Sequence, residues 1–195
     1  MNLDSFSRPL VLSSMAILFV SGVALGYFFS PEYRMDRYGE TNMRSFRADR
    51  FADLAYMNAM IAHHRGAMLL AEAAREKTTR VEIRSIAETI LREEPKAIEE
   101  LVRWKKEWYR DPRSVRDPEV PQLGEAGANF DLRFLNALLA HHQAGIEMTR
   151  AIRIRSSRGE ILDNADSVEA FLRKSGGDLA SLRETWYGIS VPSSL

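Results

Sequence analysis

The chain has 195 residues, 28% charged and 45% hydrophobic, which is a globular composition with room for one domain and an appendage. Its 27 basic and 27 acidic residues balance, so no positive field is available to gather nucleic acid, and we expect no such partner. Cysteine is absent, which excludes thiolate metal sites, cysteine nucleophiles and disulfides together.

The first predicted element is a membrane-spanning helix. Residues 9–29, PLVLSSMAILFVSGVALGYFF, carry no charge over about the length that a helix needs to cross a bilayer. We therefore predict an uncleaved N-terminal anchor within residues 1–30. A cleaved signal peptide is the alternative, because Ala24 and Gly26 supply small residues of the kind found at cleavage sites.

The charges around this segment give a small orientation signal. Arg8 precedes it, whereas Arg34, Arg37 and Arg44 follow it, which by the positive-inside rule favours a cytoplasmic body. Residues 31–43 show no hydrophobic period and are predicted to be a tether.

The folded body is predicted to span residues 44–190 and to be all-α. Apolar residues recur at helical spacing in four stretches, at about 46–74, 79–108, 131–155 and 163–187. Thr79 and Glu82 have the spacing of a capping box at the second of them. Between the second and third, residues 110–129 contain Pro112, Pro118 and Pro121, which a helix or central strand does not tolerate, so this stretch is predicted to be a connector.

The connector separates two similar halves, repeat 1 at about 44–109 and repeat 2 at about 130–188. DLAYMNAMIAHH from Asp53 and DLRFLNALLAHH from Asp131 agree at seven of twelve positions, with an offset of 131 − 53 = 78 residues. This spacing predicts two helical hairpins packed as a pseudo-twofold four-helix bundle, with the first and third helices facing each other. Asp53 and Asp131 are interpreted as salt-bridge or capping residues, because each lies ten residues before its histidine pair.

All four histidines of the chain fall at equivalent positions of the two repeats, as His63–His64 and His141–His142. At about 100° per residue, the first pair flanks Met60 on the helix surface, and Met68 lies on the same side. Met148 lies seven residues after His141, on the same edge of its helix. Both repeats are therefore predicted to direct imidazoles and thioethers toward one region.

Imidazole and thioether without thiolate favour copper, especially Cu(I), with silver as a mimic. Imidazole also suits zinc, which stays an alternative. The candidate metal ligands are His63, His64, His141, His142, Met60, Met68 and Met148, with His64 and His142 as the principal pair. Binding is expected to weaken as the pH falls through about 6, because a histidine must lose its proton to coordinate. A buried histidine on an apolar face is otherwise a hydrogen-bonded core residue.

No catalytic pattern accompanies the histidines. The Glu-x-x-His motif of di-iron bundles is absent from the sequence, because the residues three positions before the four histidines are apolar. These residues are Met60, Ile61, Leu138 and Leu139. No H-E-x-x-H, glycine-rich phosphate loop or nucleophile elbow is present either. We therefore predict a protein that is not an enzyme.

The segments MIAHHRGAMLLA and LLAHHQAGIEMT resemble the double-histidine signature of the family called domain of unknown function 305 (DUF305). This resemblance implies a ferritin-like four-helix bundle, often exported or membrane-anchored, with some members similar to periplasmic proteins that bind copper or silver. It also implies a Gln-x-x-Glu-Ile element on the following helix. This chain has Glu94, Ala97 and Ile98 at those positions in repeat 1, and the element is barely recognisable near Ser175, Asp178 and Leu179 in repeat 2.

Two functions follow from these observations. The first is a copper-binding buffer or chaperone, held by a single span in the cytoplasmic membrane with its body on the periplasmic or extracellular side. The second is a non-catalytic accessory subunit of a membrane protein complex that has inherited the helical scaffold.

Overall fold

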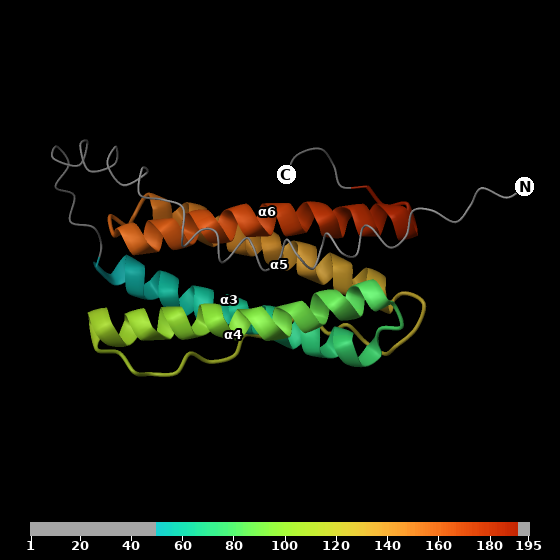
Figure 1. Cartoon of the computed structure of the whole chain (residues 1–195), viewed down its shortest axis with the longest axis horizontal. Helices are drawn as coiled ribbons and strands as arrows, with labels where there is room; N and C mark the ends of the chain where they lie inside the picture. The colour runs from blue at the N-terminus through green and yellow to red at the C-terminus, as the bar shows by residue number, and fades with distance from the viewer. Residues whose placement is uncertain (1–49, 191–195) are drawn as a thin grey trace, which may run out of the picture. The chain divides into compact units, whose positions relative to one another are not determined.

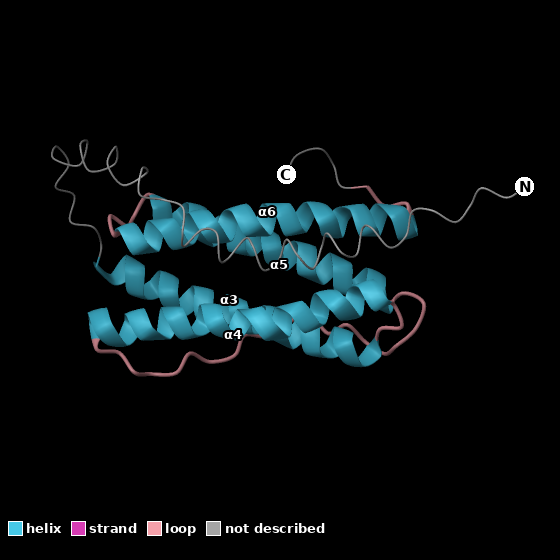
Figure 2. Cartoon of the chain, viewed as in Figure 1, coloured by secondary structure: helices cyan, strands magenta, loops and turns pink. Residues whose placement is uncertain are grey.

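The structure, a computed structural model, describes residues 50–190; the predicted membrane anchor and the predicted tether lie outside this range. Four helices account for most of the described chain: α3 (Arg50–Lys77), α4 (Val81–Tyr109), α5 (Phe130–Arg153) and α6 (Gly159–Tyr187). Figure 2 shows helices and loops only in this part, which confirms the all-α prediction. Within residues 50–190, no helix is long and apolar enough to cross a membrane.

The hairpins pack through their first helices. α3 contacts α4 along its length, α5 contacts α6 in the same way, and α3 also packs on α5 (Figure 1). The prediction that the first and third helices of the body face each other is therefore confirmed. The connector after α4 runs back along α3: Arg65 bonds the carbonyl of Val115, and Lys77 donates to the carbonyl of Gly124 at 2.9 Å.

The predicted capping box is wrong. The residue before the first turn of α4 is Arg80, and no side chain caps it, because the helix starts one residue later than a Thr79 cap requires. The neighbouring Thr78 shapes the turn instead, since its hydroxyl accepts a hydrogen bond from the Arg80 N–H at 3.1 Å. At the start of α6, Ser156 accepts from the Arg158 N–H at the same distance.

Asp131 joins the two repeats at one end of the bundle. Its carboxylate accepts a hydrogen bond from the Thr78 hydroxyl at 2.6 Å and pairs with Arg80 Nε at 3.4 Å. The Arg80 guanidinium in turn lies 4.3 Å from the centroid of a Trp186 ring. A residue of α5 is thus tied to the α3–α4 turn, and that turn is tied to α6.

The aspartate, arginine and tryptophan of this arrangement recur at the other end, each at a position 78 residues from its equivalent. Asp53 pairs with Arg158 Nε at 3.4 Å, and the Arg158 guanidinium lies 4.2 Å from the centroid of a Trp108 ring. The salt-bridge interpretation of Asp53 and Asp131 is therefore confirmed. Because each aspartate of one repeat binds an arginine of the other, the two hairpins are fixed in an antiparallel, pseudo-twofold relation.

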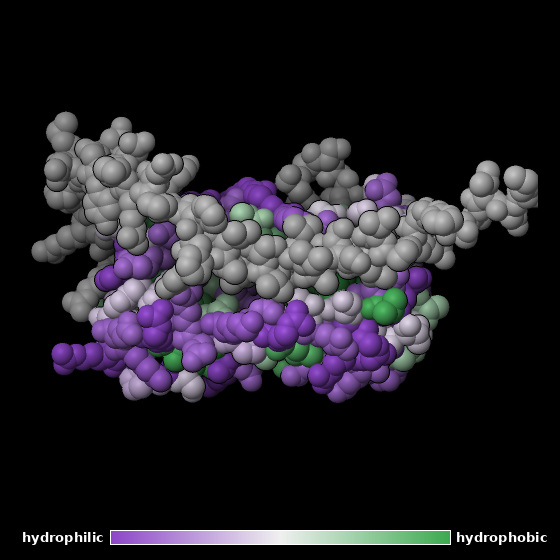
Figure 3. Space-filling view, viewed as in Figure 1, coloured by the Kyte–Doolittle hydropathy of each residue, from purple (hydrophilic) through white to green (hydrophobic). Residues whose placement is uncertain are grey.

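The core is apolar and the surface is charged. One buried cluster gathers side chains from all four helices: Ala52, Tyr56, Met57, Met60, Ile61, Leu101, Trp104, Ile152, Ile161 and Ala165. On the face seen in Figure 3, the described helices present mostly hydrophilic side chains with small separate apolar patches. This is the arrangement expected when amphipathic helices bury one stripe each.

Candidate metal centre

The two histidine pairs meet where α3 packs on α5. The rings of His63 and His141, one from each repeat, stack in parallel with centroids 3.8 Å apart and an angle of 3° between planes. The sequence prediction that both repeats direct imidazole toward one region is confirmed for this pair.

Glycines make this approach close enough. A Cβ added at Gly145 would stand 2.6 Å from His63 Nε2 and 2.5 Å from Leu172 Cδ1, and one added at Gly66 would stand 3.0 Å from His141 Cε1. Distances below 3.0 Å are sterically forbidden, so the bare backbone at Gly145 is required for the ring to sit where it does. His63 of α3 therefore packs against Gly145 of α5, and His141 of α5 packs against Gly66 of α3.

The second histidine of each pair turns toward the outer helix of its own hairpin. His64 Nδ1 hydrogen-bonds the carboxylate of Glu94 on α4, and His142 Nε2 lies 3.0 Å from the hydroxyl of Ser175 on α6. Each of the two histidines that we expected to be principal ligands thus has one ring nitrogen bonded to the outer helix of its own hairpin, α4 for His64 and α6 for His142.

Burial lowers the pKa of three of the four imidazoles, His63, His141 and His142. It lowers the pKa of His63 to about 2, assisted by the repulsive charges of His141 and the neighbouring histidines. Burial likewise lowers the pKa of His142 to about 3 and lowers that of His141, where the charge of Glu94 acts in the opposite sense. At pH 6 His63 and His142 are therefore already in the neutral form that a metal requires, so these two rings do not contribute to a loss of binding at that pH.

Three ring nitrogens of the cluster are buried without a hydrogen bond of normal geometry: His64 Nε2, His141 Nε2 and His142 Nδ1. The backbone of His63 and of Leu138 lies close enough to His141 and His142, respectively, to raise the pKa of each ring against the effect of burial. An unpaired buried polar atom costs about 1–3 kcal/mol. For His64, the bond from Nδ1 to Glu94 fixes the tautomer that leaves a lone pair on Nε2, as histidines that bind metal do. The cluster therefore offers the chemistry of a metal site.

The side chains as they stand do not already form a multidentate cage. Among residues 50–190, no group of three or more histidine and carboxylate side chains is placed to hold one ion. Cu(I) and Ag(I) need few ligands, so two imidazoles can provide a suitable site for them. Ions that require octahedral oxygen coordination are less suited to such a site.

The predicted thioether ligands lie mostly in the core. Met60 is fully buried in the apolar cluster, and Met148 packs against the same cluster. Met68 is half-buried. The contacts of Met60 and Met148 are therefore those of core residues.

Glu94, Ser175, Gly66 and Gly145 were not among the candidate site residues. Glu94 and Ser175 are separated by 81 residues, whereas α4 and α6 have equal lengths and are offset by 78, so Ser175 lies three residues, about one helical turn, beyond the repeat equivalent of Glu94. A glycine within three residues of each histidine pair, inside a predicted helix, is the signal that would have identified the close approach.

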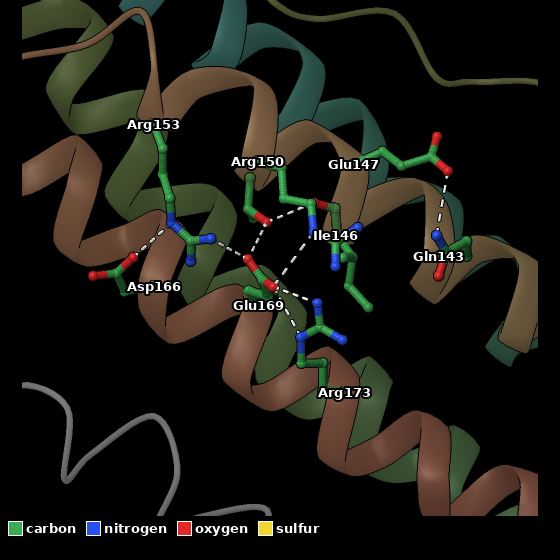
Figure 4. Close-up of polar contacts among 9 residues, drawn as sticks. Gln143, Ile146, Glu147, Arg150, Arg153, Asp166, Glu169 and Arg173 are labelled. Atoms are coloured by element: carbon green, nitrogen blue, oxygen red, sulfur yellow. Dashed lines mark hydrogen bonds and ion pairs between the residues drawn. The ribbon is translucent and has the colours of Figure 1, made fainter. Parts of the chain in front are cut away.

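A second polar cluster joins α5 to α6 (Figure 4) and belongs to the scaffold. Buried Glu169 receives hydrogen bonds from Arg173 at 2.6 Å and also pairs with Arg153, which holds Asp166 at 2.8 Å. Burial raises the pKa of Glu169, but the bonds from both arginines outweigh it and leave the pKa lowered. Each carboxylate is thus neutralised within the hairpin.

The fold and the site define an all-α bundle of two repeated hairpins with imidazoles buried at the junction between the repeats. Residues 53–120 match the family described as Domain of unknown function (DUF305). This confirms the resemblance drawn from the histidine pairs.

Solved structures with the same fold include CopM in its Cu(I)-bound form. That protein is 25% identical, with a TM-score of 0.62 over 70% of this chain and 98% of its own. CopM in an Ag-bound form is 24% identical over the same shares, also with a TM-score of 0.62. A DUF305 protein from Streptomyces coelicolor, 19% identical, has a TM-score of 0.61 over 69% of this chain and 93% of its own and shares the fold. None of the curated proteins matches this sequence significantly.

Proposed function

We propose that this chain is a membrane-anchored, extracytoplasmic protein that binds Cu(I) or Ag(I) as a buffer or chaperone, without catalytic turnover. The observation that carries the proposal is the set of three buried, unpaired imidazole nitrogens at the junction of the repeats. Structures of CopM with Cu(I), Cu(II) and silver support the choice of ion. The four histidines are the proposed ligands, with Met60, Met68 and Met148 as alternatives.

The protein's own part in binding is to hold neutral imidazoles away from water. Stacking of His63 on His141 fixes one ring from each repeat, and Glu94 orients His64. Because burial keeps His63 and His142 unprotonated, no proton has to be displaced from these rings at neutral pH.

Replacing His64 and His142 together with glutamine is expected to weaken Cu(I) binding by about 100-fold or more, because each repeat loses an oriented ligand while the stacked pair remains. The measurement is a titration of the full-length protein, without a histidine tag, against a competing Cu(I) chelator. Met68→Leu is the matched control and is expected to change the affinity less than about tenfold.

Equal uptake by the wild type and the double variant, with helicity unchanged, would contradict the histidine ligands. No uptake by either would reject the metal-binding function and favour an accessory subunit of a membrane complex.

The proposed location has its own test. A reporter fused after Leu195 is expected to be active as alkaline phosphatase, an enzyme that matures only outside the cytoplasm. An inactive phosphatase fusion together with an active cytoplasmic reporter would place the body inside, as the count of arginines beside the span favours.

A further inference from the structure

The connector lies over the histidine cluster on one side. The point where a Cβ of Gly66 would stand is 3.0 Å from His141 Cε1, 3.3 Å from Pro118 Cγ and 3.6 Å from Val120 Cγ1. His141 Cε1 is bonded to the Nε2 atom that is buried without a partner. The side chains of Pro118 and Val120 and the unpaired edge of His141 therefore meet at Gly66.

Residues 118–120 lie between two anchored parts of the connector. Before them, Arg65 of α3 bonds the Val115 carbonyl and pairs with Asp117 at 3.0 Å. After them, Lys77 and Arg133 donate to the carbonyls of Gly124 and Glu125, both at 2.9 Å. Arg65 is the neighbour of His64 and Gly66 in sequence, so the nearer anchor stands beside the site itself.

We propose that residues 115–120 form a strap that limits access to His141, and that Arg65 is the positioning residue that holds the strap down. This inference rests on the proposed function and concerns its regulation: the strap sets the rate at which a soft metal ion reaches and leaves the side of the cluster lined by His141. Equilibrium affinity depends on the ligands, which Arg65 does not supply.

The second repeat provides a matched control. Gln143 is the repeat equivalent of Arg65, and it donates to Glu147 of its own helix at 3.3 Å (Figure 4). Its replacement removes a comparable surface contact from α5 without touching the strap.

The test begins with the metal-free, full-length protein. Diethyl pyrocarbonate acylates accessible neutral imidazole nitrogens, and mass spectrometry reports each histidine separately. Arg65→Ala is expected to raise the modification rate of His141 about fivefold or more and to leave that of His142 unchanged. Asp117→Asn weakens the same anchor without altering a helix and is expected to raise the modification rate of His141 less than Arg65→Ala does. Gln143→Ala is expected to leave the modification rate of His141 unchanged.

The second arm uses Cu(I) itself. Arg65→Ala is expected to raise the association and dissociation rates by similar factors and to leave the dissociation constant within about twofold. Unchanged modification of His141, equal acceleration at His142, or a loss of affinity as large as the change in rate would each overturn the strap. If the wild type binds no Cu(I), the proposed function fails, and the modification arm still decides whether the strap covers His141.

Discussion

Lowering the pH from 7 to 4.5 is expected to reduce the free energy of unfolding of the metal-free protein by about 5 kcal/mol. The pKa values of His63 and His142 are lowered to about 2 and about 3, whereas the unfolded chain has ordinary histidines near pH 6.5. At a pH between the folded and the unfolded pKa values, these histidines are protonated in the unfolded state and neutral in the folded state. Each histidine then costs about 1.4 kcal/mol per pH unit below 6.5, which amounts to about 2–3 kcal/mol at pH 4.5.

The pH window of this effect, and not its sign, distinguishes the histidines from the carboxylates. A group whose folded pKa is lowered and whose protonated form is charged destabilises the fold as the pH falls, starting at the unfolded value of 6.5. Glu93 and Glu169 also have lowered pKa values, but their contribution is lost only as the pH falls below their ordinary range near 4.5. A loss of stability between pH 6.5 and 4.5 therefore reports the histidines, because Glu100, whose pKa is raised by burial, stabilises the fold as it takes up a proton.

Urea unfolding at several pH values, with a chelator present, measures the effect. The variant with His63→Gln and His142→Gln has no titrating group at these positions, and most of the slope is expected to disappear. A free energy of unfolding that stays constant between pH 7 and 5 in the wild type would show that the imidazoles are not buried as the structure has them.

Gly145→Ala is expected to destabilise the protein by about 1–3 kcal/mol, although alanine is the better helix former. The new methyl group would stand 2.5 Å from Leu172 Cδ1 and 2.6 Å from His63 Nε2. His63 cannot simply withdraw, because its other face is stacked on His141. The helices α3 and α5 must therefore separate or the stacked pair must break.

Gly177→Ala on α6 is the matched control, since an added Cβ there meets nothing within 4 Å. With no clash, the lower entropy of the unfolded chain and the better helix propensity should stabilise the protein by about 0.5–1 kcal/mol. The two substitutions are chemically identical, so their opposite signs isolate the close approach. If both stabilise the protein equally in urea unfolding, the histidines do not pack against Gly145.

The repeat made much of the fold predictable. Helical periodicity located four helices, and the match of Asp53 to Asp131 required two like hairpins with their first helices facing. The helix ends were less predictable. Thr79 had the spacing to Glu82 that a capping box requires, but Thr78 makes the hydrogen bond in the turn. The position of a helix end depends on where the two helices must diverge in order to pack.

The sequence by itself determined that four histidines occupy equivalent helical positions in two repeats, and hence that their side chains converge, because helix geometry fixes the direction of each side chain from its spacing. Only the tertiary structure decided which of them meet. His63 stacks on His141, whereas His64 hydrogen-bonds Glu94 and His142 lies against Ser175. That choice depends on how closely α3 approaches α5, which the bare backbone at Gly145 sets, and on which side chains the outer helices present. Periodicity within one helix carries no information about either.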